Sequence, residues 1–124
     1  MNIVDSSGWV EYFVKGANAA FFTPVVRDVD NLLVPSICIY EVFRRLFHDF
    51  GEESALQAAG IMGHGHEVAL DRKIAIDAAH ISSISKLAMA DSIIYASTLA
   101  YDAILWTQDQ HFKDLKSVKY IEKK

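Results

Sequence analysis

The chain has 124 residues, of which 52% are apolar, with a formal net charge of −4 and a sequence pI of about 5.6. This length suits one domain with a substantial core, no apolar run is long enough to span a membrane, and the single cysteine excludes both an internal disulfide and a cysteine-based zinc site. We therefore expect one soluble, cytoplasmic domain over residues 1–124 that does not bind nucleic acid through net charge alone.

The first half of the chain alternates short apolar strands with helices. Residues 2–5 predict a strand, and Ser6 or Ser7 is expected to cap a helix that ends at Gly16. Residues 17–29 predict a second helix, which Pro24 would interrupt unless it lies in a first turn. A second strand is predicted at 32–34, followed by a helix that starts at Ser36, has one apolar face and ends at Gly51. The residues of that face are Ile39, Phe43, Leu46 and Phe50.

The second half continues the same alternation. Helices are predicted at 52–62, 72–84 and 89–101, strands at 68–70, 104–107 and 118–121, and a short helical turn at 110–115. Strands that alternate with helices favour a parallel sheet covered on both faces. The predicted fold class is therefore α/β, as a three-layer α/β/α sandwich with a mostly parallel central sheet.

Four acidic residues interrupt otherwise apolar segments, and these are Asp5, Glu41, Asp91 and Asp109. Asp5 and Asp109 each follow a predicted strand, and ligands bind outside the carboxyl ends of parallel strands. Charges in apolar surroundings are rare unless they are paired or bound to metal. Because clustered carboxylates repel one another by roughly 3 kcal/mol per pair about 5 Å apart, a cluster of them requires a cation. Mg²⁺ or Mn²⁺ in such a site is typical of phosphodiester chemistry.

Each of these acids also has a simpler interpretation when taken singly. Glu41 and Asp91 lie near the starts of predicted helices and could complement the helix dipole. Asp5 could be a helix cap and Asp109 a turn residue. His111 lies beside Asp109, and we interpret it as a packed or solvated residue rather than a functional one.

Other residues leave similar alternatives open. His64 and His66 flank a glycine in a predicted loop, and no cysteine or acidic motif completes a zinc site around them. Arg44 and Arg45 could line a path for a phosphate backbone or could equally be solvated. The apolar surplus could form a larger core, a homodimer face or a groove for an amphipathic partner segment.

Four segments in order resemble the motifs of PIN-domain ribonucleases, in particular the VapC-like toxins of toxin–antitoxin pairs. The resemblance covers nearly the whole chain, although each motif alone is weakly specific. The segments are Asp5-Ser6-Ser7 after the first strand, Ser36 to Arg45 around Glu41, Leu87 to Ala96 around Asp91, and Thr107 to Phe112 around Asp109.

The resemblance implies a metal-dependent endoribonuclease that uses Mg²⁺ or Mn²⁺. Its catalytic and metal-binding residues would be Asp5, Glu41, Asp91 and Asp109, with direct metal contact best supported for the first two. Hydrolysis by metal-activated water would leave a 3′-hydroxyl and a 5′-phosphate. Ser7 and Thr107 match positions of small polar residues that would orient carboxylates or water, and Arg44 is a candidate substrate contact.

The resemblance also implies partners. These are an RNA substrate, a VapB-like antitoxin that inhibits the toxin through an amphipathic segment, and a second copy in a homodimer. The alternative function is a non-catalytic RNA-binding or regulatory PIN-like module. The intact set of acids argues against that alternative, because a module without catalysis has no reason to keep mutually repelling carboxylates.

Overall fold

The computed structural model describes residues 1–124 and is built on a five-stranded sheet with the order β3-β2-β1-β4-β5. Every neighbouring pair of strands is parallel, and β1 lies at the centre between β2 and β4. The strands are β1 (Asn2–Val4), β2 (Leu32–Pro35), β3 (His66–Val68), β4 (Ile104–Thr107) and β5 (Val118–Tyr120). The helices are α1 (Ser6–Phe13), α2 (Ala19–Arg27), α3 (Ser36–Phe50), α4 (Glu52–Met62), α5 (Arg72–Ser85) and α6 (Met89–Ala100), with 3₁₀ turns η1 (Val29–Asn31) and η2 (Gln110–Phe112).

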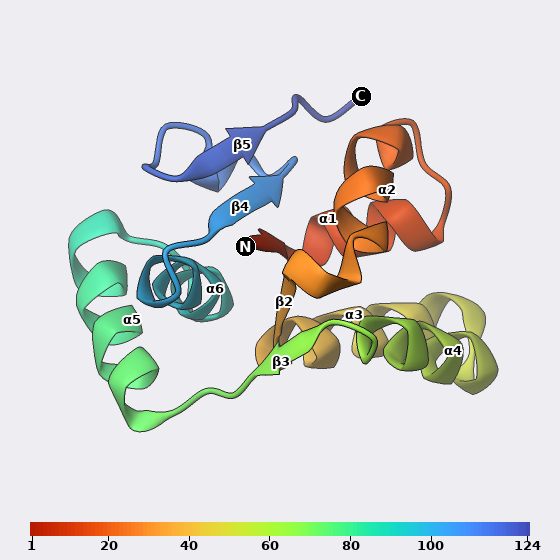
Figure 1. Ribbon diagram of the computed structural model, residues 1–124, viewed down its shortest axis with the longest axis horizontal. Coiled ribbons are helices and arrows are strands. Elements are labelled where there is room, and N and C mark those ends of the chain that lie inside the picture. The colour runs from red at the N-terminus through yellow and green to blue at the C-terminus, as the bar shows by residue number, and fades with distance from the viewer.

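Helices lie on both sides of the sheet. Figure 1 shows α5 and α6 on one side of the central strands and α1 and α2 on the other, with α3 and α4 packed together beside α1. The crossovers between the parallel strands run through α-helices, except for the β4–β5 connection, which contains only η2, and the helices bury both faces of the sheet. The predicted α/β/α fold is therefore confirmed, with a sheet that is entirely parallel. No helix combines the length and the apolar character that crossing a membrane requires.

The core is centred on the middle strands. All four residues of β2 are buried, as are Ile3 and Val4 of β1. Trp9 of α1 and Phe22 of α2 are fully buried on one side of these strands. Such continuous apolar strands are expected where helices cover both faces of a sheet, and this burial holds the strand ends in fixed positions.

Several local predictions were wrong. Asp5, rather than Ser6 or Ser7, is the N-cap of α1, and this helix ends at Phe13, before Gly16. Pro24 lies inside α2 and not in its first turn. β3 spans His66–Val68, where it pairs with β2 from Leu33 to Pro35. The strand therefore lies two residues before the predicted position at 68–70.

The predicted apolar face of α3 also differs from the buried one. The structure buries Cys38, Val42 and Leu46, whereas Phe50 is exposed. These three residues follow a strict four-residue spacing, which places them on a face adjacent to the one predicted. The aromatic residues of α3 therefore remain accessible at the molecular surface.

Candidate active site

The four predicted acids line one open cleft of about 620 Å³ at the carboxyl edge of the sheet. Asp5 directly follows β1, and Asp109 lies two residues past the end of the adjacent parallel strand β4. Glu41 enters from α3, the helix that follows β2, and Asp91 enters from the first turn of α6. Four elements that are far apart in sequence therefore place their carboxylates around the same space.

Asp5 is buried at the bottom of this cleft and is the most constrained of the acids. Its Oδ1 accepts a hydrogen bond from the backbone N–H of Gly8 at 3.0 Å, which caps α1. Its Oδ2 accepts from the hydroxyls of Ser7 and Thr107, each at 2.9 Å. Burial nevertheless raises the pKa of Asp5 from 3.8 to about 7, and the nearby charge of Asp109 acts in the same direction.

Thr107 connects Asp5 to the loop that carries Asp109. While its hydroxyl donates to Asp5, the same Oγ1 accepts a hydrogen bond from the backbone N–H of Asp109 at 2.9 Å. The Asp109 carboxylate in turn accepts from the backbone N–H of His111, also at 2.9 Å, and so caps the short turn η2. The end of β4 therefore positions both acids through one hydroxyl group.

Glu41 is held by a contact that the sequence did not indicate. The Ser6 hydroxyl donates to Glu41 Oε1 at 2.6 Å, although the two residues lie 35 positions apart. Ser6 was considered as a possible helix cap and as the middle residue of the Asp5-Ser6-Ser7 motif, but no role was assigned to its side chain. Its position directly after Asp5 at the end of β1 is the one signal that could have identified it.

Asp91 and Asp109 form a tighter group with His111. One potential ligand atom from each residue lies within 4.8 Å of the others. The His111 Nδ1 is 3.1 Å from Asp109 Oδ1 and 3.8 Å from Asp91 Oδ2. Partial burial raises the pKa of Asp91 to about 6, and the charges of Asp109 and Glu41 add to this effect while His111 opposes it.

Cys38 is buried close to the cleft, and the charges of three of the four acids act on its thiol. Its buried thiol is a weak donor to the carbonyl oxygen of Val4 at 3.9 Å. Burial raises the pKa of this thiol well above its ordinary value, and the charges of Asp5, Glu41 and Asp91 raise it further. The thiol therefore stays protonated and is not a reactive group.

The donor set fits a hard divalent cation. No lysine or arginine forms an ion pair with any of the four carboxylates. His111 is the only side chain that forms such a contact with them, and it is charged only when protonated. Carboxylate oxygens in this number are the ligands that Mg²⁺ and Mn²⁺ take in proteins. Burial raises the pKa of Asp91 most, the charges of Asp109 and Glu41 raise it further, and a bound cation would oppose both effects.

Of the two arginines considered in the sequence, Arg45 lines the cleft and Arg44 does not. Arg44 does not line the acidic cleft and instead borders an adjacent depression with Tyr40 and Glu41. Arg45 and Lys123 line the cleft itself, although Arg45 is engaged by Asp49 at 2.7 Å. His64 and His66 are exposed and lie outside the cleft.

Comparisons with known proteins agree with this architecture. A chain of the toxin–antitoxin complex from Klebsiella pneumoniae superposes with a TM-score of 0.77 at 16% identity, covering 96% of both chains. VapC20 from Mycobacterium tuberculosis, a sarcin–ricin loop cleaving toxin, gives 0.80 at 13% identity and covers 95% of this chain and 97% of its own. DNA-bound VapBC from Salmonella typhimurium gives 0.75 at 12% identity, with 98% and 96% covered.

At sequence identities this low, the superpositions show that the fold is shared. A search among curated proteins gives no significant match. The sequence itself matches the PIN domain family over residues 3–118, a range that contains all four acids of the cleft. The chain therefore belongs to the PIN-domain family.

Proposed function

We propose that this protein is a metal-dependent endoribonuclease that acts as the toxin of a toxin–antitoxin pair. The observation that carries the proposal is the convergence of Asp5, Glu41, Asp91 and Asp109 in one open cleft of a PIN-domain chain. A cleft open to solvent admits a polymeric substrate, whereas an enclosed pocket would restrict access to small molecules. The acids supply the oxygen ligands that phosphodiester hydrolysis with divalent ions requires.

The roles of the residues follow from their contacts. Asp5, Glu41, Asp91 and Asp109 would hold Mg²⁺ or Mn²⁺, which when bound polarises the scissile phosphate and lowers the pKa of coordinated water. Ser7 and Thr107 orient the Asp5 carboxylate, and Ser6 orients Glu41. Arg45 and Lys123 place positive charge at the walls, where it can contact a phosphate backbone.

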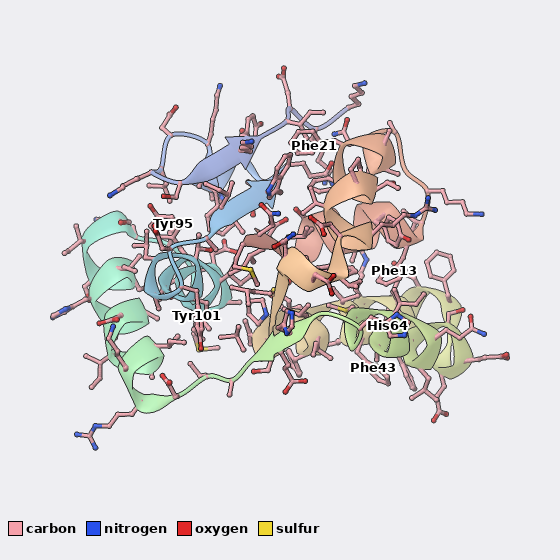
Figure 2. All side chains as sticks on the ribbon, viewed as in Figure 1. Phe13, Phe21, Phe43, His64, Tyr95 and Tyr101 are labelled. Atoms are coloured by element: carbon pink, nitrogen blue, oxygen red, sulfur yellow. The ribbon has the colours of Figure 1, made fainter.

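An apolar groove next to the cleft supports inhibition by an antitoxin segment. The groove is lined by Phe13, Val14, Leu46, Phe50, Ser54, Gln57, Ala58 and Ile61. Figure 2 shows Phe13 at the end of α1 facing α4. Because Val14 and Phe50 line both this groove and the acidic cleft, an amphipathic VapB-like segment lying in the groove would reach the acids. Structures of such toxin–antitoxin complexes share this fold.

A homodimer is also proposed. Ile84 and Met89, at the connection between α5 and α6, have exposed fractions of 82% and 72%. Large apolar side chains this exposed are typical of surfaces that are covered by a partner. Their location on α5 and α6 leaves the groove between α1, α3 and α4 free for a different partner.

The proposal is tested by substituting Asp5→Asn and Glu41→Gln in the purified protein and incubating each variant with a panel of transfer, ribosomal and messenger RNAs. We expect the parent protein to cleave at least one RNA with Mg²⁺ or Mn²⁺, leaving a 3′-hydroxyl and a 5′-phosphate. Both variants should lose at least 100-fold in rate, on the order of what removing one key electrostatic group costs. Glu53→Gln, a change on the surface of α4, is the matched control and should leave cleavage unchanged.

Four outcomes would contradict the proposal. Cleavage that survives EDTA, or that is equal in Asp5→Asn, would exclude the metal-dependent reaction at this site. Cyclic-phosphate products would exclude direct attack by water. RNA binding without any cleavage would favour the alternative function, a non-catalytic RNA-binding or regulatory module.

A further inference from the structure

His111 is the only side chain that brings a nitrogen ligand to the group of carboxylates in the cleft. Its Nδ1 lies 3.1 Å from Asp109 Oδ1 and 3.8 Å from Asp91 Oδ2, and the three potential ligand atoms lie within 4.8 Å of one another. The ring itself is 67% exposed, so it can turn toward an ion without losing packing contacts. We propose that the His111 imidazole is a ligand of the divalent ion held by Asp91 and Asp109, and that this site therefore prefers Mn²⁺ to Mg²⁺.

Contacts of the neighbouring residues fix the backbone at His111, so the point from which its side chain extends is defined. Phe112 is fully buried and packs near Tyr95 of α6, the helix that also carries Asp91. The Asp109 carboxylate accepts the His111 backbone N–H at 2.9 Å. The turn η2 is thus anchored on both sides of His111, and the only recorded partners of the exposed imidazole are the carboxylates of Asp109 and Asp91.

The chemistry of the donor set determines the preference. Mg²⁺ takes oxygen ligands almost exclusively, whereas imidazole nitrogen suits transition metals. Mn²⁺ also favours oxygen ligands, but as a transition-metal ion it binds an imidazole nitrogen more readily than Mg²⁺ does, so replacing one oxygen ligand by an imidazole favours Mn²⁺ over Mg²⁺. This inference rests on the proposed metal-dependent function, but it concerns ion binding and can be measured without RNA.

The competing interpretation is an ion pair. A protonated His111 would neutralise Asp91 and Asp109 and would compete with a metal ion for the same carboxylates. The two interpretations predict opposite effects of removing the ring. A ligand's removal weakens Mn²⁺ binding, whereas a competitor's removal strengthens the binding of both ions where the ring is protonated and leaves it unchanged where the ring is neutral.

The test measures Mn²⁺ and Mg²⁺ binding to the metal-free protein by titration calorimetry at pH 8, where an ordinary imidazole is neutral. Pulsed electron paramagnetic resonance on the Mn²⁺-loaded protein reports whether a ring nitrogen is coordinated. In His111→Gln we expect the Mn²⁺ affinity to fall about tenfold or more, the Mg²⁺ affinity to change much less, and the nitrogen coupling to disappear. The control His80→Gln, an exposed histidine of α5, should retain the affinity and the coupling.

Three results would overturn the assignment. Mn²⁺ binding without nitrogen coupling in the parent protein, or an unchanged or higher Mn²⁺ affinity in His111→Gln, would show that His111 is not a ligand while leaving the proposed nuclease function intact. Absence of any divalent-ion binding by the parent protein would overturn both. Because the substituted ring is exposed, circular dichroism of the variant should match that of the parent and exclude misfolding as a cause.

Discussion

Asp5 occupies an environment that disfavours its own charge. The side chain is 2% exposed, and three hydrogen-bond donors approach it from Gly8, Ser7 and Thr107. These donors stabilise the anion, yet burial outweighs them and the pKa of Asp5 rises to about 7. In the absence of a cation, a large fraction of the molecules therefore carries a proton on Asp5 at neutral pH.

This shift predicts how the stability of the metal-free protein depends on pH. The unfolded chain releases the Asp5 proton near the ordinary value of 3.8, whereas the folded protein keeps it until about pH 7. Between these values the folded state binds more protons, so the free energy of unfolding decreases as pH rises through the window. Asp91, with a pKa of about 6, contributes with the same sign. Thermal unfolding in EDTA should give a lower Tm at pH 8 than at pH 5.

The variant Asp5→Asn isolates the contribution of Asp5. We expect it to reduce the pH dependence by an amount on the order of a few kcal/mol and to reduce the stabilisation that Mn²⁺ gives at pH 8. Asp77→Asn, an exposed partner of Lys73, is the control and should leave the pH dependence unchanged. An equally steep dependence in Asp5→Asn would contradict the shifted pKa.

The sequence revealed the acids of the site, and the family resemblance named Ser7 and Thr107 as residues that would orient carboxylates, but the contact of Ser6 with Glu41 was not anticipated. A carboxylate within an apolar segment stands out in a linear pattern, and all four candidates line the cleft. Hydroxyl partners leave no such pattern, because Thr107 lies 102 residues from Asp5 and Ser6 lies 35 from Glu41. His111 was visible beside Asp109, but its approach to Asp91 depends on how the loop after β4 folds against α6.

At the scale of elements, the first turn of α1 forms one wall of the site and tolerates no side chain at Gly8. A Cβ at this position would lie 2.7 Å from Phe22 Cε1 and 2.7 Å from Val4 Cγ1. Gly8 also donates its N–H to Asp5. The close approach of α1 to β1 and α2 therefore determines both the packing of this layer and the position of the Asp5 carboxylate.

We expect Gly8→Ala to destabilise the fold by about 1–3 kcal/mol, because Val4 and Phe22 would have to move within a close-packed core. Urea unfolding monitored by tryptophan fluorescence measures the change. The control is Gly60→Ala in α4, where a Cβ meets nothing within 4 Å and alanine favours the helix, so stability should rise by roughly 0.5–1 kcal/mol. A neutral Gly8→Ala would contradict the tight contact.

The C-terminal segment is tied to the cleft by a buried asparagine. Asn18 is 2% exposed, and its Nδ2 donates to Gln108 Oε1 at 2.9 Å and to the carbonyl oxygen of Glu122 at 3.1 Å. Figure 1 shows the C-terminus ending beside α2. This arrangement places Lys123 at the cleft wall, where no carboxylate pairs with it.

Lys123 is therefore predicted to bind a substrate phosphate. In the nuclease-inactive Asp5→Asn background, Lys123→Gln should weaken RNA binding severalfold and reduce the slope of log affinity against log salt concentration by about 0.7, the contribution of one phosphate contact on a single strand. Lys124→Gln changes the same charge one position away, outside the residues that line the cleft, and is the matched control. Equal effects of the two substitutions would show a general charge effect and exclude a specific contact.

The fold itself was predictable where periodicity and burial agree. The predicted bounds of α4 and β4 match the structure, because each is a compact run flanked by a clear stop. The buried face of α3 was not predictable, because Ile39, Phe43 and Phe47 also recur at four-residue spacing. They border a shallow apolar depression with Tyr40 and Arg44. Figure 2 shows Phe43 on α3 away from the sheet. Spacing alone cannot distinguish an apolar face that packs inward from one that meets a partner.

At the scale of the whole molecule, distinct surfaces are available for distinct partners. The acidic cleft and the apolar groove beside it share Val14 and Phe50, whereas Ile84 and Met89 project from the hairpin of α5 and α6. Each copy carries a net charge of −4, so two copies repel each other at long range and their net charge does not favour self-association. Association through the α5–α6 hairpin would therefore depend on apolar contacts.

We expect the double substitution Ile84→Lys with Met89→Lys to convert a dimer into a monomer in sedimentation-velocity experiments. Because both side chains are more than two-thirds exposed, the monomer should remain folded. Leu56→Lys, at an exposed apolar position of α4, is the control and should leave the dimer intact. A parent protein that sediments as a monomer at all concentrations would contradict the proposed homodimer.

The central position of β1 also determines how much of the chain must be translated before the site can form. β1 leaves the ribosome first, but it stays unpaired on one side until β4, which ends at Thr107, has been translated. A nascent chain that has reached only α5 contains Asp5 and Glu41 but lacks Asp91, Asp109 and His111. The site therefore cannot assemble until the chain has been translated beyond Thr107 and through the loop that carries Asp109 and His111.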